Sequence, residues 1–248
     1  MKKYGLIGFP LTHSFSEKYF SEKFKNENIS AKYSLYPLHE ISDLKKLLEE
    51  EPELVGLNVT IPYKKLIIQH LTDIDPIAEE VGAVNTLKIE RKDKISIKGY
   101  NTDIYGFEIL LEEICYEWKD ALVLGSGGAA AAVCFVLRQK QIPYHIVSRT
   151  PKTGMFGYDE LTAEVIDNHK LIINTTPLGM FPNVEAKPEI DYGAIGKNHI
   201  LIDLIYNPAE TAFLREGRTR GAKTVNGAAM LTAQAEKAFE IWSKDGGI

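Results

Sequence analysis

The stretch Ala121-Leu-Val-Leu-Gly-Ser-Gly-Gly-Ala-Ala130 decides the fold of this chain. It reads as an apolar strand, a glycine turn and the start of a helix that continues through the apolar run AVCFVLRQK. Gly125, Gly127 and Ala130 fit the dinucleotide-binding fingerprint, with alanine in its third position. Gly125 permits the tight turn, and Gly127 lets the backbone approach a pyrophosphate at the helix N-terminus. An ordinary strand-turn-helix is the alternative, but the apolar strand and helix on either side favour a dinucleotide site.

Strand and helix patterns alternate on the carboxyl-terminal side of this stretch. Apolar strands are expected at Tyr144–Ser148, Leu171–Asn174, Ile200–Ile205 and Lys223–Val225, with a variable stretch that contains glycine and proline after the first of them and a helix before the last. Such alternation predicts a doubly wound, Rossmann-type nucleotide domain. The chain then closes with an amphipathic helix over Ala228–Trp242.

The first hundred residues alternate in the same way. We expect strands at Lys3–Gly8, Ala31–Pro37 and Val55–Val59 and helices at Ser16–Asn28 and Asp43–Glu50. A hairpin of Ala83–Glu90 with Lys94–Gly99 follows. Strands separated by helices indicate a second α/β domain with mostly parallel pairing. A helix over Tyr105–Tyr116 connects the two domains.

Composition excludes several classes of protein. The 248 residues are 44% hydrophobic and carry a net charge of −5, which argues against nucleic acid as the main partner. The start of the chain lacks the apolar segment of a signal peptide, and no run reaches membrane-spanning length, so we expect a cytoplasmic protein. The two cysteines, Cys115 and Cys134, cannot form a disulfide framework. The six histidines show no ligand spacing, so no metal site is expected.

A polar loop, Asn58-Val-Thr-Ile-Pro-Tyr-Lys64, follows one of the expected strands. Asn58 and Thr60 can each hydrogen-bond a hydroxyl group, Lys64 can donate a proton, and Pro62 stiffens the turn. A polyhydroxylated small molecule with a carbonyl group suits such a loop. A polar strand end with a solvated lysine is the alternative. Because open α/β sheets bind ligands beyond the carboxyl ends of their strands, we expect the polar loops of both domains to face one cleft between them.

Nine ordered motifs make the chain resemble the shikimate dehydrogenase family over nearly its whole length. They are LTHSFS (11–16), NVTIPYK (58–64), VGAVNT (81–86), NTD (101–103), GSGGAA (125–130), SRT (148–150), NTTPLGM (174–180), DLIYNP (203–208) and NGAAMLTAQ (226–234). The resemblance implies metal-free, reversible reduction of 3-dehydroshikimate to shikimate with NADPH, a step in chorismate and aromatic amino acid biosynthesis. It also implies a substrate-binding and catalytic domain of residues 1–103 plus 226–248 and an NADP-binding Rossmann domain of residues 104–225. Shikimate is then the small-molecule partner of a monomer or homodimer that binds neither nucleic acid nor membrane.

The resemblance assigns catalysis to Lys64 and Asp103. Hydride transfer to a ketone builds negative charge on its oxygen, and a positioned proton donor must neutralise that charge. Lys64 matches the family's catalytic lysine, and Asp103 matches the aspartate beside it. The sequence leaves open which of the two donates the proton. Asp103 can also be the N-cap of the connector helix.

Substrate contacts are implied for seven residues. Ser14 and Ser16 match the pair that binds the substrate carboxylate, although Ser16 can instead cap a helix. The other implied substrate ligands are Asn58, Thr60, Asn85, Tyr206 and Gln234. Asn85 can alternatively satisfy buried backbone groups, and Gln234 implies that the last helix folds back onto the first domain.

Cofactor contacts are implied for residues of the nucleotide domain. No acidic residue follows its second strand, where NAD-binding domains place one for the ribose hydroxyl, whereas Arg149 and Lys152 suit a 2′-phosphate. A solvated Arg149 is the alternative. The full set implied for NADP(H) is Gly125, Ser126, Gly127, Gly128, Ala129, Ser148, Arg149, Thr150, Lys152, Thr175 and Gly227.

Two positions depart from the family pattern. Glu17 replaces a usual proline and adds negative charge beside the expected carboxylate site, unless it points outward from the first turn of a helix, as we expect. Ser148 replaces a usual asparagine, which can relax the preference for NADP over NAD. A quinate/shikimate dehydrogenase that uses either cofactor, and a non-catalytic NADP-binding regulator, are the alternatives; retention of Lys64 and Asp103 argues against the regulator.

Overall fold

The computed structural model describes residues 1–11, 14–114 and 120–244. The chain divides into two compact units, Met1–Thr102 with Ala235–Ile248 and Asp103–Gln234. The carboxyl-terminal division therefore falls inside the last helix, α8 (Ala228–Ser243), rather than at residue 226. Among the described residues no helix is long and apolar enough to cross a bilayer.

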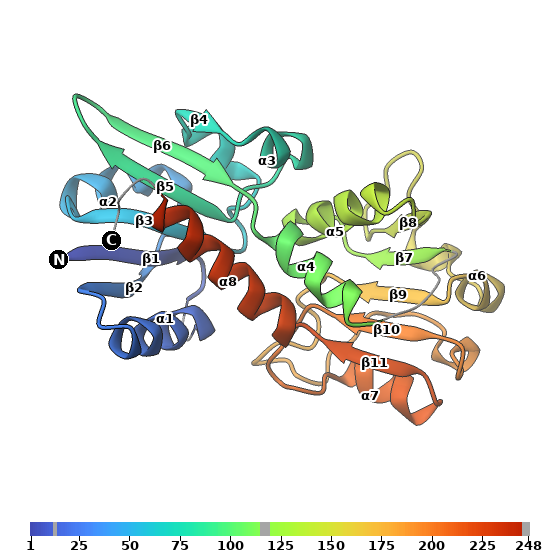
Figure 1. Cartoon of the computed structure of the whole chain (residues 1–248). Helices are drawn as coiled ribbons and strands as arrows, with labels where there is room; N and C mark the ends of the chain where they lie inside the picture. The colour runs from blue at the N-terminus through green and yellow to red at the C-terminus, as the bar shows by residue number, and fades with distance from the viewer. Residues whose placement is uncertain (12–13, 115–119, 245–248) are drawn as a thin grey trace. The chain divides into compact units, whose positions relative to one another are not determined.

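The first unit contains a six-stranded mixed sheet in the order β2-β1-β3-β5-β6-β4. Its elements (Figure 1) are β1 (Lys2–Gly8), α1 (Phe15–Asn26), β2 (Ala31–Pro37), α2 (Leu44–Glu50), β3 (Leu54–Val59), β4 (Asp73–Ile74), α3 (Pro76–Val81), β5 (Thr86–Arg91) and β6 (Ile95–Tyr100). β1 pairs in parallel with β2 and β3, and β5 and β6 form the predicted antiparallel hairpin. The strand order reverses at β1, so the loops after β1 and β3 flank a switch point, where such sheets bind ligands.

The second unit contains a five-stranded parallel sheet in the order β11-β10-β9-β7-β8 (Figure 1). Its elements are α4 (Asp103–Glu112), β7 (Ala121–Leu124), α5 (Gly128–Gln139), β8 (Tyr144–Val147), α6 (Ala163–Asn168), β9 (Leu171–Asn174), β10 (Ile200–Asp203), α7 (Ala212–Thr219), β11 (Lys223–Asn226) and the first part of α8. The order again reverses beside the first strand, between β7 and β9. The doubly wound topology predicted from the glycine stretch is confirmed.

Both faces of the second sheet are buried, as a doubly wound fold requires. Leu122, Ile172 and Leu201 are register neighbours and form one apolar cluster with side chains of α6 and α7. The following residue on each strand points to the opposite face and is fully buried as well: Val123, Ile173 and Ile202. The sheet is therefore held from both sides, and only its edges and strand ends are available for chemistry.

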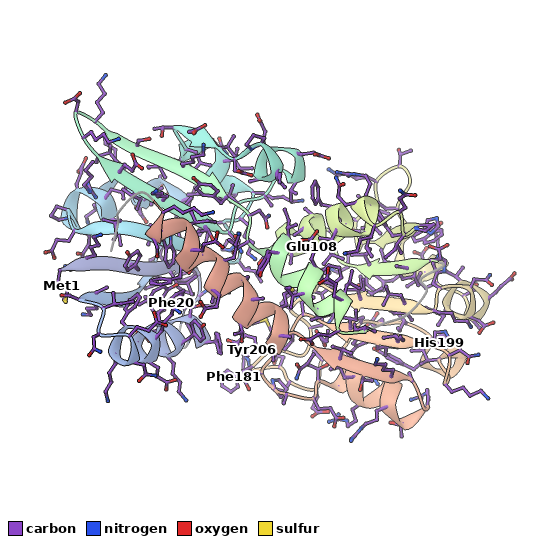
Figure 2. The ribbon with its side chains drawn as sticks, in the orientation of Figure 1. Met1, Phe20, Glu108, Phe181, His199 and Tyr206 are labelled. Carbon is purple, nitrogen blue, oxygen red and sulfur yellow. The ribbon has the colours of Figure 1, made fainter. Side chains whose placement is uncertain are left out.

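An aromatic cluster attaches the end of α8 to the first unit. Phe20, labelled in Figure 2, is fully buried, and its ring centroid lies 4.7 Å from that of Tyr33 and 5.4 Å from that of Trp242. The Trp242 indole donates to the Leu87 carbonyl at 2.9 Å. A Cβ atom on Gly56 would lie 2.5 Å from the same indole, so the strand there must carry glycine. The last helix thus returns to the first unit, as the sequence predicted.

Two expectations fall partly outside the described residues. The connector helix is α4, which begins at Asp103 and ends at Glu112, two residues earlier at its start than predicted. Its predicted end at residues 115 and 116, with Cys115, lies outside the described residues, as do residues 12 and 13 of the first motif. Cys134 is buried in α5, consistent with an apolar role.

Candidate functional site

A buried polar network lies at the carboxyl end of β3 in the first unit. The Tyr33 hydroxyl donates to the Asn58 amide oxygen at 2.8 Å. The Asn58 amide nitrogen approaches the Thr86 hydroxyl at 3.2 Å and the Asn85 carbonyl at 3.4 Å. Burial raises the pKa of Tyr33, so its hydroxyl stays protonated and remains a donor. Asn58 is therefore held in one orientation by protein groups, which is how a ligand-binding side chain is pre-organised.

Asn85 extends this network to the strand end of β6. Its amide oxygen accepts from the Thr102 backbone N–H at 2.7 Å and from the hydroxyl groups of Thr102 and Thr86, both at 3.1 Å. Asn85 is 2% exposed. The alternative considered for Asn85, satisfying a buried backbone group, describes what its amide oxygen does.

The loop that carries Thr60 and Lys64 is fixed by backbone hydrogen bonds. The Thr60 N–H donates to the Ile7 carbonyl at 2.9 Å, which ties the loop to the end of β1. The Val84 N–H donates to the Lys64 carbonyl at 2.7 Å. Between them, the buried Tyr63 donates its hydroxyl to the Leu38 carbonyl at 2.7 Å. Lys64 is half-buried, and these hydrogen bonds fix the backbone that carries it.

The two serines of the first motif have different local roles. Ser14, and not Ser16, is the N-cap of α1, and its hydroxyl accepts from the Ser16 N–H at 3.1 Å. Ser16 is 7% exposed, and its hydroxyl hydrogen-bonds to Tyr33. Glu17 stands in the first turn of α1, where the helix dipole favours an acid. Its charge also raises the pKa of Tyr33, after the larger effect of burial, so Glu17 lies within electrostatic range of the network.

Three further candidate residues belong to the second unit. Asp103 is the first residue of α4 and is 5% exposed. Gln234 is 8% exposed, and its amide nitrogen donates to the Leu231 carbonyl at 3.0 Å. Tyr206, labelled in Figure 2, is half-buried in the segment after β10. A Cβ atom on Gly106 would lie 3.2 Å from the Gln234 Cβ, so α4 and α8 meet closely at this point.

The glycine loop of the second unit has the geometry that a dinucleotide requires. Gly125 has a φ of +112°, and a Cβ atom there would lie 2.6 Å from the Thr175 hydroxyl oxygen. Gly127 has a φ of −78° and is the N-cap of α5; a Cβ atom there would meet nothing within 4 Å. The space in front of the α5 N-terminus is therefore open, and its N–H groups can bind a phosphate. Gly227 differs, because a Cβ atom there would lie 2.1 Å from the Leu204 carbonyl oxygen, so its glycine is needed for packing.

The segment after β8 places polar and basic side chains beside the glycine loop. Ser148 is 5% exposed; its hydroxyl lies 3.2 Å from that of Ser126 and accepts from the Thr150 N–H at 3.3 Å. Arg149 and Lys152 are both exposed. Ser148 therefore links the glycine loop to the basic segment.

A second buried network supports the strand ends next to the glycine loop. The Asp203 carboxylate accepts from Asn174 at 3.1 Å, from the Ile205 N–H at 3.0 Å and from the Thr211 hydroxyl at 2.6 Å. Burial raises the pKa of Asp203 to about 6, although these three donors act in the opposite direction. The Thr175 hydroxyl donates to the Leu124 carbonyl at 2.7 Å, directly below Gly125.

The residues that position the candidate side chains were not predicted from the sequence. In the first unit these are Tyr33, Thr86 and Thr102; in the second they are Asn174, Asp203 and Thr211. Asn174 and Asp203 stand inside two quoted motifs, at the ends of β9 and β10, which was the available signal. Tyr33 stands in an ordinary alternating strand and gave none.

These features define a class: two-unit α/β proteins in which one unit is built to bind a dinucleotide and the other presents a pre-organised polar site. The comparisons narrow this class. Residues 6–87 match the family described as the shikimate dehydrogenase substrate binding domain. The shikimate dehydrogenase (NADP(+)) of Methanococcus aeolicus is 39% identical over 260 residues, covering 98% of this chain and 92% of that protein.

Solved structures agree over the whole chain. Shikimate dehydrogenase 1 from Peptoclostridium difficile is 37% identical with a TM-score of 0.85, covering 98% of this chain and 91% of that one. The Thermus thermophilus shikimate 5-dehydrogenase in complex with NADP(H) and shikimate is 28% identical with a TM-score of 0.85, covering 98% and 94%. The chain belongs to the shikimate dehydrogenase family.

Proposed function

We propose that this protein is an NADP-dependent shikimate dehydrogenase, which reversibly reduces 3-dehydroshikimate to shikimate. The observation that carries the proposal is the family relationship over 98% of the chain, since it spans both the nucleotide unit and the unit with the polar site. The open space before the α5 N-terminus fits a pyrophosphate, and the basic segment after β8 fits a 2′-phosphate. NADPH, when bound, supplies the hydride that reduces the ketone.

We assign the proton transfer to Lys64 and Asp103. As the ketone carbon gains a hydride, its oxygen becomes an alkoxide and needs a proton. The Lys64 ammonium group is the proposed donor, and its loop is fixed by backbone hydrogen bonds to Ile7 and Val84, which favours a defined position for the reaction. Asp103 is assigned to the same proton transfer, either to orient this ammonium group or to exchange the proton with it. Either Lys64 or Asp103 can therefore be the final proton donor.

Substrate recognition follows the polar network of the first unit. Ser14 and Ser16 are proposed to bind the carboxylate, and Asn58, Thr60 and Asn85 the ring hydroxyl groups, with Tyr206 and Gln234 contributed by the second unit. Hydroxyl and amide groups suit a ligand rich in hydroxyl groups because they both donate and accept. The Tyr33 hydroxyl supports this assignment, since it fixes Asn58 and contacts Ser16.

Cofactor recognition is assigned to the second unit. Gly125, Ser126, Gly127, Gly128 and Ala129 are proposed to surround the pyrophosphate. Arg149 and Lys152 then bind the 2′-phosphate, and Ser148, Thr150, Thr175 and Gly227 complete the contacts or hold the loop in place. A cytoplasmic monomer or homodimer is proposed as the working form on the sequence arguments alone.

Initial rates test the proposal. Purified enzyme is assayed for reduced-cofactor formation with shikimate or quinate, each with NADP⁺ or NAD⁺. We expect the highest kcat/KM with shikimate and NADP⁺, and at least a tenfold preference for NADP⁺, since charge-assisted phosphate contacts contribute about 1.5–3 kcal/mol each. Arg149→Ala with Lys152→Ala should remove most of that preference by raising KM for NADP⁺ alone.

The alternatives give different results in the same assay. Comparable rates with quinate and with both cofactors would identify a quinate/shikimate dehydrogenase of relaxed cofactor use. Binding of NADP⁺ without any reduction in the presence of either substrate would identify a non-catalytic regulator. Either result would contradict the proposed function.

A further inference from the structure

Three potential metal ligands lie together at the amino-terminal ends of the strands of the second sheet. Asp120 immediately precedes β7, His145 is the second residue of β8, and His169 lies two residues before β9. Because β8, β7 and β9 are adjacent parallel strands, their amino ends lie together. The glycine loop follows the carboxyl end of β7, so this cluster and the proposed cofactor site lie at opposite ends of the strands. The two histidines are 24 residues apart in sequence, which is why spacing gave no sign of it.

The ligand atoms are separated by distances that one metal ion would bridge. His145 Nδ1 lies 3.0 Å from His169 Nε2. The Asp120 carboxylate oxygens lie 3.9 Å from His145 Nδ1 and 3.6 Å from His169 Nε2. In a tetrahedral zinc site with bonds of about 2.0–2.1 Å, neighbouring ligand atoms are about 3.3 Å apart. The distance between the two histidine nitrogens is about 0.3 Å shorter than this, and the two Asp120 distances, which involve its two different oxygens, are about 0.3 and 0.6 Å longer, so side-chain rotations of Asp120 and His145 would bring one oxygen into place.

Surrounding groups orient the three side chains. His169 Nδ1 lies 2.6 Å from the Val165 carbonyl oxygen, so Nδ1 carries the proton and the Nε2 lone pair faces His145 and Asp120. The Ala121 N–H donates to Asp120 at 2.9 Å, and the His145 ring stacks on Phe156 with centroids 4.9 Å apart. A backbone carbonyl behind a histidine ligand is the usual outer support of a metal site.

A hydrogen bond between the two histidines is the simpler interpretation, and it accounts for only part of the arrangement. It explains the 3.0 Å contact. It leaves the Asp120 carboxylate 3.6 and 3.9 Å from the two ring nitrogens, distances beyond direct hydrogen bonds. One cation among the three groups would engage all of them.

We propose that Asp120, His145 and His169 form a binding site for a divalent transition-metal ion of the zinc type. Two imidazoles and one carboxylate suit Zn²⁺, Co²⁺ or Ni²⁺, whereas Mg²⁺ and Ca²⁺ prefer oxygen ligands. His145 and Asp120 are partly exposed, with 44% and 30% of their side-chain surface accessible, so an ion can enter and water can take the fourth position. His169, with an accessible fraction of 8%, forms the inner wall.

Cobalt binding tests the site directly. Tag-free protein, stripped with a chelator and dialysed, is titrated with Co²⁺ while its visible absorption is recorded. We expect saturable growth of the strong bands of a four-coordinate ion, without thiolate charge-transfer absorption, and displacement by Zn²⁺. His145→Gln should weaken Co²⁺ binding at least tenfold, and Asp120→Asn should weaken it as well.

A control and a second measurement make the result decisive. His39→Gln changes an exposed histidine of the first unit and should bind Co²⁺ like the unaltered protein. At a hundredfold excess of Zn²⁺ over its Kd, the unaltered protein should melt about 5 °C or more higher, and His145→Gln should not. The proposal is overturned if Co²⁺ remains six-coordinate, or if His145→Gln and His39→Gln bind it equally.

Discussion

Several of the side chains predicted to bind a ligand are held in place by other side chains of the protein. Asn58 and Asn85 were predicted as substrate ligands, and the structure shows each of them engaged by neighbouring protein groups. Tyr33 fixes the Asn58 amide group through a hydrogen bond, and nothing in its alternating strand sequence indicates this role. The motifs therefore pointed to Asn58 and Asn85, whereas the contact between Tyr33 and Asn58, 25 positions apart, could be seen only in the fold.

The proposed proton donor Lys64 can be tested by substitution. Lys64→Ala should lower kcat about 100- to 10,000-fold with little change in the KM for shikimate, because the group acts mainly in the transition state. Asp103→Asn should also lower kcat, by less if Asp103 only orients the lysine. Lys65→Ala, which alters the exposed neighbour, is the matched control and should keep normal turnover. Near-normal turnover of Lys64→Ala would refute the assignment.

Asp203 carries a prediction about pH. Its pKa is raised from 3.8 to about 6 in the folded protein, so the folded state holds a proton that the unfolded state has released between about pH 4 and pH 6. The contribution of Asp203 to the free energy of unfolding is therefore full below pH 4, falls as pH rises towards 6 and is constant above it. The total loss is about 2–3 kcal/mol.

Denaturant unfolding of the protein and of Asp203→Asn measures this contribution, since asparagine cannot titrate. From about pH 4 to pH 7, the stability of the unaltered protein relative to the variant should fall by about 2–3 kcal/mol. Parallel pH profiles would show that the Asp203 carboxyl ionises normally.

Secondary-structure elements were predicted more completely than their supporting contacts. The strands Ala31–Pro37, Ala121–Leu124 and Leu171–Asn174 have the predicted limits: the first follows from its alternating pattern, and the other two from short apolar runs that end at a glycine or an asparagine. Helix α3 was missed although Asp75 caps it, Pro76 begins it and Gly82, with a φ of 67°, ends it. At six residues it is too short for a hydrophobic period, and only its cap signals could have revealed it.

The glycine loop between β7 and α5 gives a prediction that separates folding from binding. Gly125→Ala should lower stability by about 1–3 kcal/mol, because alanine disfavours a positive φ and its methyl group would meet Thr175. Gly127→Ala should leave stability nearly unchanged, since φ is ordinary and the space is open, yet raise the KM for NADP⁺ at least tenfold.

Thermal unfolding and steady-state kinetics of the two variants provide the check. Equal stability losses would mean that Gly127 is also a packing position. An unchanged KM for NADP⁺ in Gly127→Ala would remove the pyrophosphate from this loop.

Across the whole molecule, the two units share one feature of sheet topology. In each sheet the strand order reverses beside the first strand, and some of the candidate residues follow the two strands that flank this reversal, β1 and β3 in the first sheet and β7 and β9 in the second. The polar clusters in the sequence predicted sites beyond the carboxyl ends of the strands, but they did not predict the strand order. The sequence did not predict the cluster of Asp120, His145 and His169, because the amino ends of strands carry no such expectation and parallel pairing alone brings those residues together.

Isotope transfer tests the central claim most directly. The enzyme is given 3-dehydroshikimate with NADPH that carries deuterium at both C4 positions, and the product is analysed by mass spectrometry and NMR. We expect shikimate with one deuterium on its new carbinol carbon, formed by the unaltered enzyme and by Lys65→Ala but far more slowly by Lys64→Ala. Absence of deuterated shikimate, with NADPH bound and the protein folded, would contradict this claim.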